Sequence, residues 1–175
     1  MSRPLIGKGA GRWGDCIGDI FEWDLVCREI RFASTEYVAA LALRDRVLRQ
    51  PLGLKFTDEE LSRDKGDLHL GAFAKGRLIA CLILTLSPLA GLPGAVRLTR
   101  MRQVAVDPLH QGLGVGKALV DFAERLARQR GFAGITLNAR EHAVLFYRRL
   151  GYETQGPPFK AVTLVHWRMF KTLKD

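Results

Sequence analysis

The sequence is organised around Val104-Ala-Val-Asp-Pro-Leu-His-Gln-Gly-Leu-Gly-Val-Gly-Lys117. This stretch opens on a β-branched run that favours a strand. Asp107-Pro108 ends the strand, because proline has no N–H group to donate to a sheet. From Val115, apolar side chains recur at steps of three and four residues, which predicts an amphipathic helix to about Arg130.

Glycines occupy the entry to this helix, where the first backbone N–H groups have no intrahelical partner. Gly112, Gly114 and Gly116 would let an anion approach those groups closely. The turn therefore predicts a site for phosphate or pyrophosphate.

Three phosphate-binding patterns compete for this turn. A P-loop ends in Gly-Lys-Ser/Thr, whereas Lys117 is followed by Ala118, which offers no hydroxyl for magnesium. A dinucleotide fingerprint needs Gly-x-Gly-x-x-Gly and an acidic residue after the next strand, but that strand leads to Asn138 and Arg140. The third pattern, Gln/Arg-x-x-Gly-x-Gly/Ala, is matched in full by residues 111–116.

With a Val-Ala-Val strand and Asp-Pro before it, and Phe146-Tyr-Arg-Arg-Leu-Gly-Tyr152 after it, this turn resembles the GNAT family of acyl-CoA N-acyltransferases. The resemblance covers roughly residues 28 to 170, with the specific motifs in 98–152. It implies an α/β (α+β) fold: a mixed, mostly antiparallel twisted sheet of six to seven strands, flanked by about four helices on both faces.

The resemblance implies an N-acetyltransferase activity. The acetyl group of acetyl-CoA would pass to an amine of a small molecule or protein, by direct attack in a ternary complex and without a metal. A catalytically idle domain that binds acyl-CoA as a sensor or interaction module is the alternative. A homodimer is compatible with the resemblance, because dimers are common in the family.

In the resembled family, the strand before the glycine turn binds pantetheine through its backbone, and the turn holds the pyrophosphate of coenzyme A. The cofactor-binding residues implied here are Val104, Val106, Gln111, Gly112, Leu113, Gly114, Val115, Gly116, Lys117, Asn138 and Tyr147. Lys117 and Arg148 could also reach the cofactor phosphates, or could be solvated helix surface.

Two of these residues match catalytic positions of the family. The backbone N–H of Val104 is the candidate that would stabilise negative charge on the thioester oxygen. Tyr147 matches the tyrosine that often protonates the leaving sulfur, and its alternative is an aromatic packing role.

The general base is harder to assign. Many family members carry a glutamate on the strand before the turn, whereas this sequence has Arg100 and Arg102 there. A water relay, or a carboxylate from elsewhere such as Glu36, remains open. Strand alternation predicts that both arginines share one face with Val104 and Val106.

Acceptor binding has several candidates. Arg100 and Arg102 would pair with a carboxylate or phosphate of the acceptor, or form cross-strand ion pairs instead. His166, in a late strand, either faces the acceptor or is an ordinary strand residue. By the resemblance, a wall formed between the first two helices adds three further candidates, namely Arg44, Arg46 and Phe56. Each could instead be a surface or packing residue.

Composition bounds the remaining possibilities. The chain has 175 residues, which suits one domain over 25–175 after a flexible N-terminal extension over 1–24. The net charge of +9 suits an anionic cofactor or substrate, but no basic run interleaved with aromatic residues marks a nucleic-acid site. The longest apolar run, residues 78–86, is too short to cross a membrane.

Cysteine usage and the N-terminus indicate the compartment. Cys16, Cys27 and Cys81 are odd in number and form neither a Cys-x-x-Cys pair nor a zinc spacing, which favours a reducing environment. The N-terminus has no apolar segment typical of a secretory signal. We therefore expect a cytoplasmic protein.

Local patterns predict the other elements. Apolar runs bounded by turn residues predict strands over 25–32, 67–74, 77–86, 96–107, 132–138, 152–154 and 163–170. Apolar periodicity and capping residues predict helices over 35–48, 57–63 and 141–150.

Overall fold

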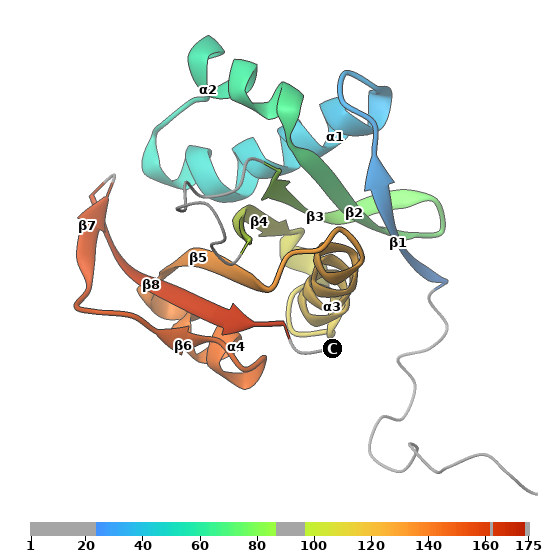
Figure 1. Cartoon of the computed structure of the whole chain (residues 1–175). Coiled ribbons are helices and arrows are strands. Elements are labelled where there is room, and N and C mark those ends of the chain that lie inside the picture. Colours follow the sequence, from blue (N-terminus) through green and yellow to red (C-terminus); the bar gives the residue numbers. More distant parts are fainter. Residues whose placement is uncertain (1–23, 87–96, 162, 174–175) are drawn as a thin grey trace, which may run out of the picture.

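Eight strands form one mixed sheet in the computed structural model, which describes residues 24–86, 97–161 and 163–173. The strands are β1 (Leu25–Ile30), β2 (Leu68–Ala74), β3 (Arg77–Thr85), β4 (Leu98–Val106), β5 (Gly134–Arg140), β6 (Glu153–Thr154), β7 (Phe159–Ala161) and β8 (Leu164–Thr172). Their order across the sheet is β1-β2-β3-β4-β5-β8-β6, with β7 paired to β8 (Figure 1). Among the described strands only β4 and β5 run parallel, so the predicted mixed, mostly antiparallel sheet is confirmed.

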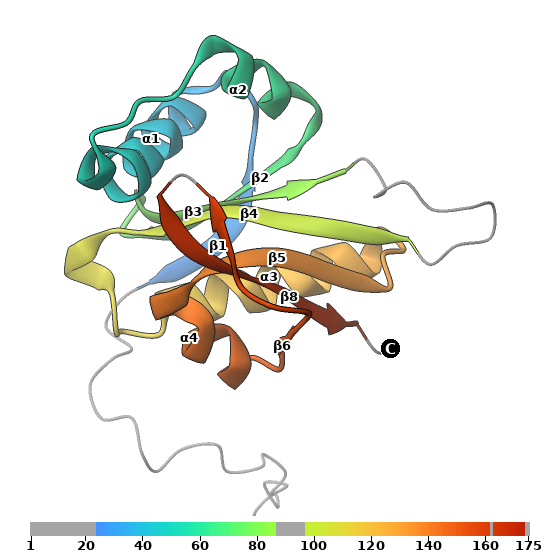
Figure 2. The same cartoon turned by 90° about the vertical axis from the view of Figure 1, so that its left-hand side faces the viewer.

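Helices cover both faces of the sheet, as predicted. They are α1 (Thr35–Arg44), α2 (Asp58–Ser62), α3 (Val115–Gln129) and α4 (Val144–Arg149). Shorter helical turns are η1 (Asp45–Arg49), η2 (Gln50–Leu52), η3 (Arg63–Gly66), η4 (Pro108–His110) and η5 (Glu141–Ala143). Helices α1 and α2 lie on one face, and α3 and α4 lie on the other (Figure 2).

Each face has its own apolar core. Under α3 and α4, side chains such as Leu119 and Ile135 are fully buried. Under α1, a smaller cluster includes Leu43, Phe73 and Cys81. Burial of apolar surface stabilises the fold by about 25 cal/mol per Å². The hydrophobic effect therefore packs helices against both faces of the sheet.

Local signals set most of the element boundaries. Ser34 caps α1 by accepting a hydrogen bond from the Tyr37 amide, and Thr57 and Glu60 form the predicted capping box of α2. The helix predicted over 35–48 is present as α1, followed after Arg44 by the wider π-helical turn η1. One expectation was wrong, because the strand β7 lies in a segment predicted as loop.

Some predictions fall partly outside the described residues. The N-terminal extension lies there almost entirely, as does Cys16. Cys27 and Cys81 are free thiols. Within the described segments, no helix is long and apolar enough to cross a membrane, and no group of His, Cys, Asp or Glu is arranged to hold a metal ion.

A β-bulge interrupts β4. Ala105 pairs with Cys81 and Arg102 pairs with Ile83, so two residues of β4, Gln103 and Val104, stand opposite one residue of β3. Gln103 has a φ of 53°, in the left-handed region. The bulge inserts a residue into the alternation of side chains.

The bulge overturns the prediction that Arg100 and Arg102 share a face with Val104 and Val106. The two valines pack against the core under α3. Arg102 instead forms ion pairs on the α1 face of the sheet. The extra residue at Gln103 is the physical reason, because it shifts the period of the strand by one.

Strands β4 and β5 part near the middle of the sheet. Their parallel pairing runs only from Leu98 and Gly134 to Arg100 and Thr136. Beyond that point β4 continues against β3, and β5 continues against β8. The sheet is therefore open between the bulge and the end of β5.

Candidate active site

A cavity of about 810 Å³ occupies the opening between β4 and β5. On one face of the sheet it is lined by the glycine turn, the first residues of α3, and η5 with α4, which we call the α3 side. On the other face it is lined by η1, η2, Phe56, and residues of β7 and β8, which we call the α1 side. Two molecules could thus meet in the sheet from opposite faces.

The glycine turn offers free backbone donors to the cavity. Gly112 and Gly114 have φ values of 77° and 79°, and a side chain built on either would meet open space. Gly114 caps α3, and the first amide of the helix to bond within it is that of Ala118, 3.0 Å from the Gly114 oxygen. The amides before Ala118 have no intrahelical partner, so an anion can accept from them.

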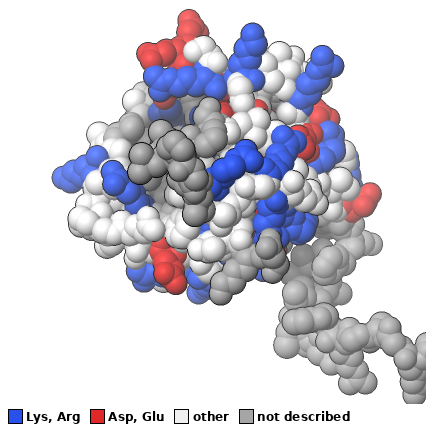
Figure 3. All heavy atoms as spheres, in the orientation of Figure 1, with Lys and Arg blue, Asp and Glu red and all other residues white. Residues whose placement is uncertain are grey.

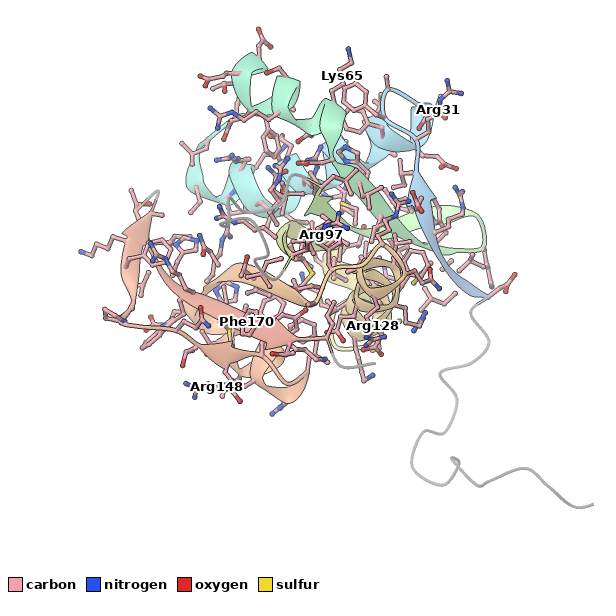
Figure 4. The ribbon with its side chains drawn as sticks, in the orientation of Figure 1. Arg31, Lys65, Arg97, Arg128, Arg148 and Phe170 are labelled. Atoms are coloured by element: carbon pink, nitrogen blue, oxygen red, sulfur yellow. The ribbon has the colours of Figure 1, made fainter. Side chains whose placement is uncertain are left out.

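Most of the predicted cofactor-binding residues line the cavity: Val104, Val106, Gln111, Gly112, Gly114, Gly116, Lys117, Asn138 and Tyr147. Leu113 and Val115 do not line it. Leu113 is exposed, and Val115 is buried in the core under α3. Arg149 lines the cavity from α4, whereas its neighbour Arg148 is exposed at the outer edge of the molecule (Figure 4).

Tyr147 reaches the cavity from α4. Its side chain is 7% exposed and packs edge-on against Phe146 and Tyr152, with ring centroids 5.0 and 5.7 Å away. Burial raises the pKa of Tyr147 well above its ordinary value, so the phenol keeps its proton at neutral pH. Since the hydroxyl bonds to no other described residue, its proton is available to a bound molecule.

A buried polar network underlies the α1 side. Asp64, which is 1% exposed, forms ion pairs of 2.9 Å with both Arg44 and Arg102 and accepts a hydrogen bond of 3.0 Å from the Tyr37 hydroxyl. Burial alone would raise the pKa of Asp64, but the ion pairs and hydrogen bonds hold it below its usual range. Arg44 also donates to the Gln103 amide oxygen at 2.5 Å, which ties the network to the bulge of β4.

The two predicted strand arginines are placed differently from each other. Arg102 lines the cavity, but its guanidinium already pairs with Asp64 and, at 2.6 Å, with Asp67. This is an ion-pairing role within the protein, one of the two alternatives. Arg100 is exposed and does not line the cavity.

Other acceptor candidates lie in and outside the cavity. Phe56 lines it, whereas Arg44 is buried behind the wall and Arg46 pairs with Asp107 at 2.8 Å. Glu36 forms an ion pair of 2.5 Å with Arg28 and does not line the cavity.

His166 lines the α1 side from β8. Its Nδ1 lies 3.0 Å from the Leu164 carbonyl oxygen, which can only accept, so Nδ1 carries the proton in the neutral ring. The imidazole stacks on Phe159 at 5.9 Å between centroids. In this tautomer Nε2 has a free lone pair and can take a proton.

Sequence reasoning missed Arg49 and Arg140, which both line the α1 side. Neither stands in a recognisable motif, because η1 and the end of β5 meet only in the folded chain. The described lining holds five Arg or Lys residues, three His residues, and no Asp or Glu. The outer surface differs from this lining because it carries charges of both signs. In the view of Figure 3, acidic side chains lie over α2, and basic side chains are scattered around them.

Comparisons with known proteins agree with this geometry. A sequence profile described as the acetyltransferase (GNAT) family matches residues 21–152. Over 134 residues the chain is 29% identical to an uncharacterized N-acetyltransferase, YitI, of Bacillus subtilis (strain 168), covering 75% of this chain and 89% of that protein.

Solved structures share the fold. An acyl-CoA N-acyltransferase from Pseudomonas aeruginosa has a TM-score of 0.66 at 20% identity, covering 85% of this chain and 99% of that one. An aminoglycoside 6'-N-acetyltransferase complexed with coenzyme A has a TM-score of 0.70 at 15% identity, covering 86% and 98%. At these identities the likeness concerns the fold alone.

Proposed function

Because the chain belongs to the GNAT acetyltransferase family, we propose that it transfers an acetyl group from acetyl-CoA to an amine in a ternary complex. That the chain is an acyltransferase follows from the family. The observation that supports direct transfer is the cavity lined from both faces of the sheet, because each substrate then has an entrance of its own. The acetyl donor would enter from the α3 side and the amine from the α1 side.

The residues of the α3 side fit coenzyme A. Its phosphates need close backbone donors, and the turn offers unbonded amides with open space at Gly112 and Gly114. Lys117 and Arg149 line the same entrance, where the Lys117 ammonium pairs with Asp121 at 2.5 Å. When bound, acetyl-CoA supplies an activated acetyl thioester, and the protein orients this thioester in the cavity.

The opening in the sheet supplies two catalytic groups. Gln103 and Val104 sit in the bulge, opposite a single residue of β3, and we propose that the Val104 N–H stabilises charge on the acetyl oxygen. Tyr147 is protonated and faces the cavity, and we propose that it donates its proton to the departing sulfur.

The α1 side supplies a proton acceptor. An alkyl ammonium has a pKa near 10 and must lose a proton before it can attack a carbonyl. Among the described lining residues on this side, His166 alone has a free lone pair on a titratable ring nitrogen. We propose that His166 Nε2 takes this proton, directly or through a water.

Calorimetry with acetyl-CoA tests the proposal. In Gly116→Asp, the new Cβ would lie 3.4 Å from Phe146 and 3.5 Å from Val106, which are ordinary contacts, and a carboxylate in the first turn suits a helix. The same carboxylate repels phosphate, so we expect the Kd for acetyl-CoA to rise at least about 10-fold, a cost of about 1.4 kcal/mol.

The matched control is Gly66→Asp, because Gly66 lies in η3 with open space around its Cβ position. This variant should bind acetyl-CoA like the wild type. Equal Kd values in the wild type and Gly116→Asp would remove the glycine turn from cofactor binding. No binding by the wild type would overturn the proposed function.

A further inference from the structure

The arginines of the α1 side differ in whether their charge is neutralised. Arg102 pairs with Asp64 and Asp67, and Arg49 pairs with Glu60 while its guanidinium lies 4.6 Å from the Phe56 ring centroid. Arg140 has no carboxylate partner among the described residues. It is the one lining arginine of this side whose charge the described part of the chain leaves uncompensated.

Arg140 is nonetheless held in place. It is the last residue of β5, and its Nη2 donates a hydrogen bond of 2.8 Å to the Leu48 carbonyl oxygen of η1. That bond uses one of the five N–H donors of the guanidinium. Burial, and then the neighbouring Arg49, lower the pKa of Arg140, which shows that its surroundings disfavour the bare charge.

The position of Arg140 relates it to the reacting groups. Asn138 precedes it by two residues on the same strand, so both side chains point to the same face. His166, the proposed proton acceptor, is its pairing partner across β5 and β8. A ligand held by Arg140 would therefore lie beside the group that receives the amine's proton.

We propose that the acceptor is a small amine that also carries a carboxylate, such as a free amino acid, and that Arg140 binds this carboxylate. The inference rests on the proposed function, because it assigns the acceptor of the same cavity. A carboxylate matches the planar donor fork of a guanidinium with two parallel hydrogen bonds. A polycationic acceptor would instead meet the uncompensated Arg140 and no acidic side chain in the described lining.

The test compares each amino acid with its C-terminal amide and with its decarboxylated amine, at saturating acetyl-CoA, by release of the coenzyme A thiol. A hydrogen bond to a charged group contributes enough for kcat/KM to be about 10-fold to 100-fold higher for the acid. In Arg140→Gln, KM for the acid should rise until this preference is lost. An unchanged calorimetric Kd for acetyl-CoA, which binds on the α3 side, shows that the variant folds.

Arg168→Gln is the matched control, because Arg168 is an exposed arginine of β8 that does not line the cavity. It should keep the preference for the acid. Arg140→Lys should restore only part of it, since an ammonium lacks the planar fork.

A second measurement is independent of turnover: calorimetric binding of N-acetyl amino acids and their amides to the protein loaded with coenzyme A. Selective binding of the acid that is lost in Arg140→Gln, without any turnover, would support the inference and overturn the proposed catalysis. Equal treatment of acid and amide in both assays would overturn the inference while leaving acetyl-CoA binding intact. Acetylation of acidic peptides but of no free amino acid would also overturn it.

Discussion

The two sides of the cavity are built in different ways. The α3 side is made of consecutive backbone, in which the turn from Gln111 leads directly into α3. The α1 side is made of side chains drawn from distant elements, from Arg49 in η1 to His166 in β8. A site of consecutive backbone is visible as a motif, whereas a site of converging side chains is visible only after folding.

This contrast separates a shared function from an individual one. Backbone amides at a helix N-terminus bind any phosphate group, whatever the acceptor. Side chains that converge on the α1 side can change one at a time without disturbing that turn. We therefore expect changes on the α3 side to affect all acceptors equally, and changes on the α1 side to affect some acceptors more than others.

The largest effect is expected for Tyr147→Phe on the α3 side. Removing the phenolic proton should lower kcat by about 10² to 10⁴, the usual contribution of a positioned acid or base, for every acceptor tested. The Kd for acetyl-CoA should stay unchanged, because the ring still packs against Phe146 and Tyr152. Steady-state kinetics beside calorimetry measures both.

Tyr152→Phe is the control for this variant. Tyr152 is 1% exposed, its hydroxyl lies beside the Glu124 carboxylate, and it does not line the cavity. The kcat of the Tyr152→Phe variant should remain at the wild-type value. If Tyr147→Phe turns over as fast as Tyr152→Phe, Tyr147 is only a packing residue.

On the α1 side the largest effect should be on stability. Asp64→Asn leaves Arg44 buried without its counter-charge, which should lower the free energy of unfolding by about 3–5 kcal/mol. Denaturant unfolding measures this change. Glu59→Gln is the matched control, because Glu59 pairs with Arg63 on the exposed surface of α2, where such a pair contributes about 0.5 kcal/mol or less.

Equal stability of the two variants would show that the network under α1 does not depend on the Asp64 charge. The expected result would show instead that the Asp64 charge stabilises the folded chain. Arg44 joins Asp64 to Gln103, so this network connects α1 and η3 to the bulge of β4.

The α3 side could be predicted from sequence because each of its signals is local. The strand, the Asp-Pro stop, the glycines and the amphipathic helix follow one another within residues 104–130, and each has a physical rule. The bulge at Gln103 escaped such rules, because no glycine or proline marks it and its partner Arg44 lies 59 residues away.

Because the bulge was not predicted from the sequence, Arg102 was assigned to the wrong face of β4. Strict alternation placed Arg102 on the same face as Val104, whereas the extra residue turns it to the opposite face, where it pairs with Asp64 and Asp67. In the sequence, Arg140 indicated only that the strand does not end in the acidic residue of a dinucleotide-binding site. Its lack of a counter-charge becomes visible only in the folded chain, where the described cavity lining contains no Asp or Glu.

The smallest expected effect is a dependence of stability on pH, which should arise on the α1 side and not on the α3 side. His69 is 3% exposed under α1, with Nε2 2.8 Å from the Asp64 carbonyl oxygen, and burial lowers its pKa. The folded state therefore binds fewer protons than the unfolded chain, so stability is fully present above the unfolded value of about 6.5 and falls as the pH drops below it. The lowered pKa of Asp64 adds a second loss, beginning near its unfolded value of about 4.

Unfolding free energies between pH 7.5 and 5 test the first of these losses, in the wild type and in His69→Gln. The wild type should lose stability steadily as the solution is acidified, and the variant should show a flatter profile, because glutamine has no proton to gain. Binding of acetyl-CoA to the folded protein should change less over the same interval, since the amides of the glycine turn do not titrate. A profile equally steep in both proteins would place the acid sensitivity elsewhere than in the network under α1.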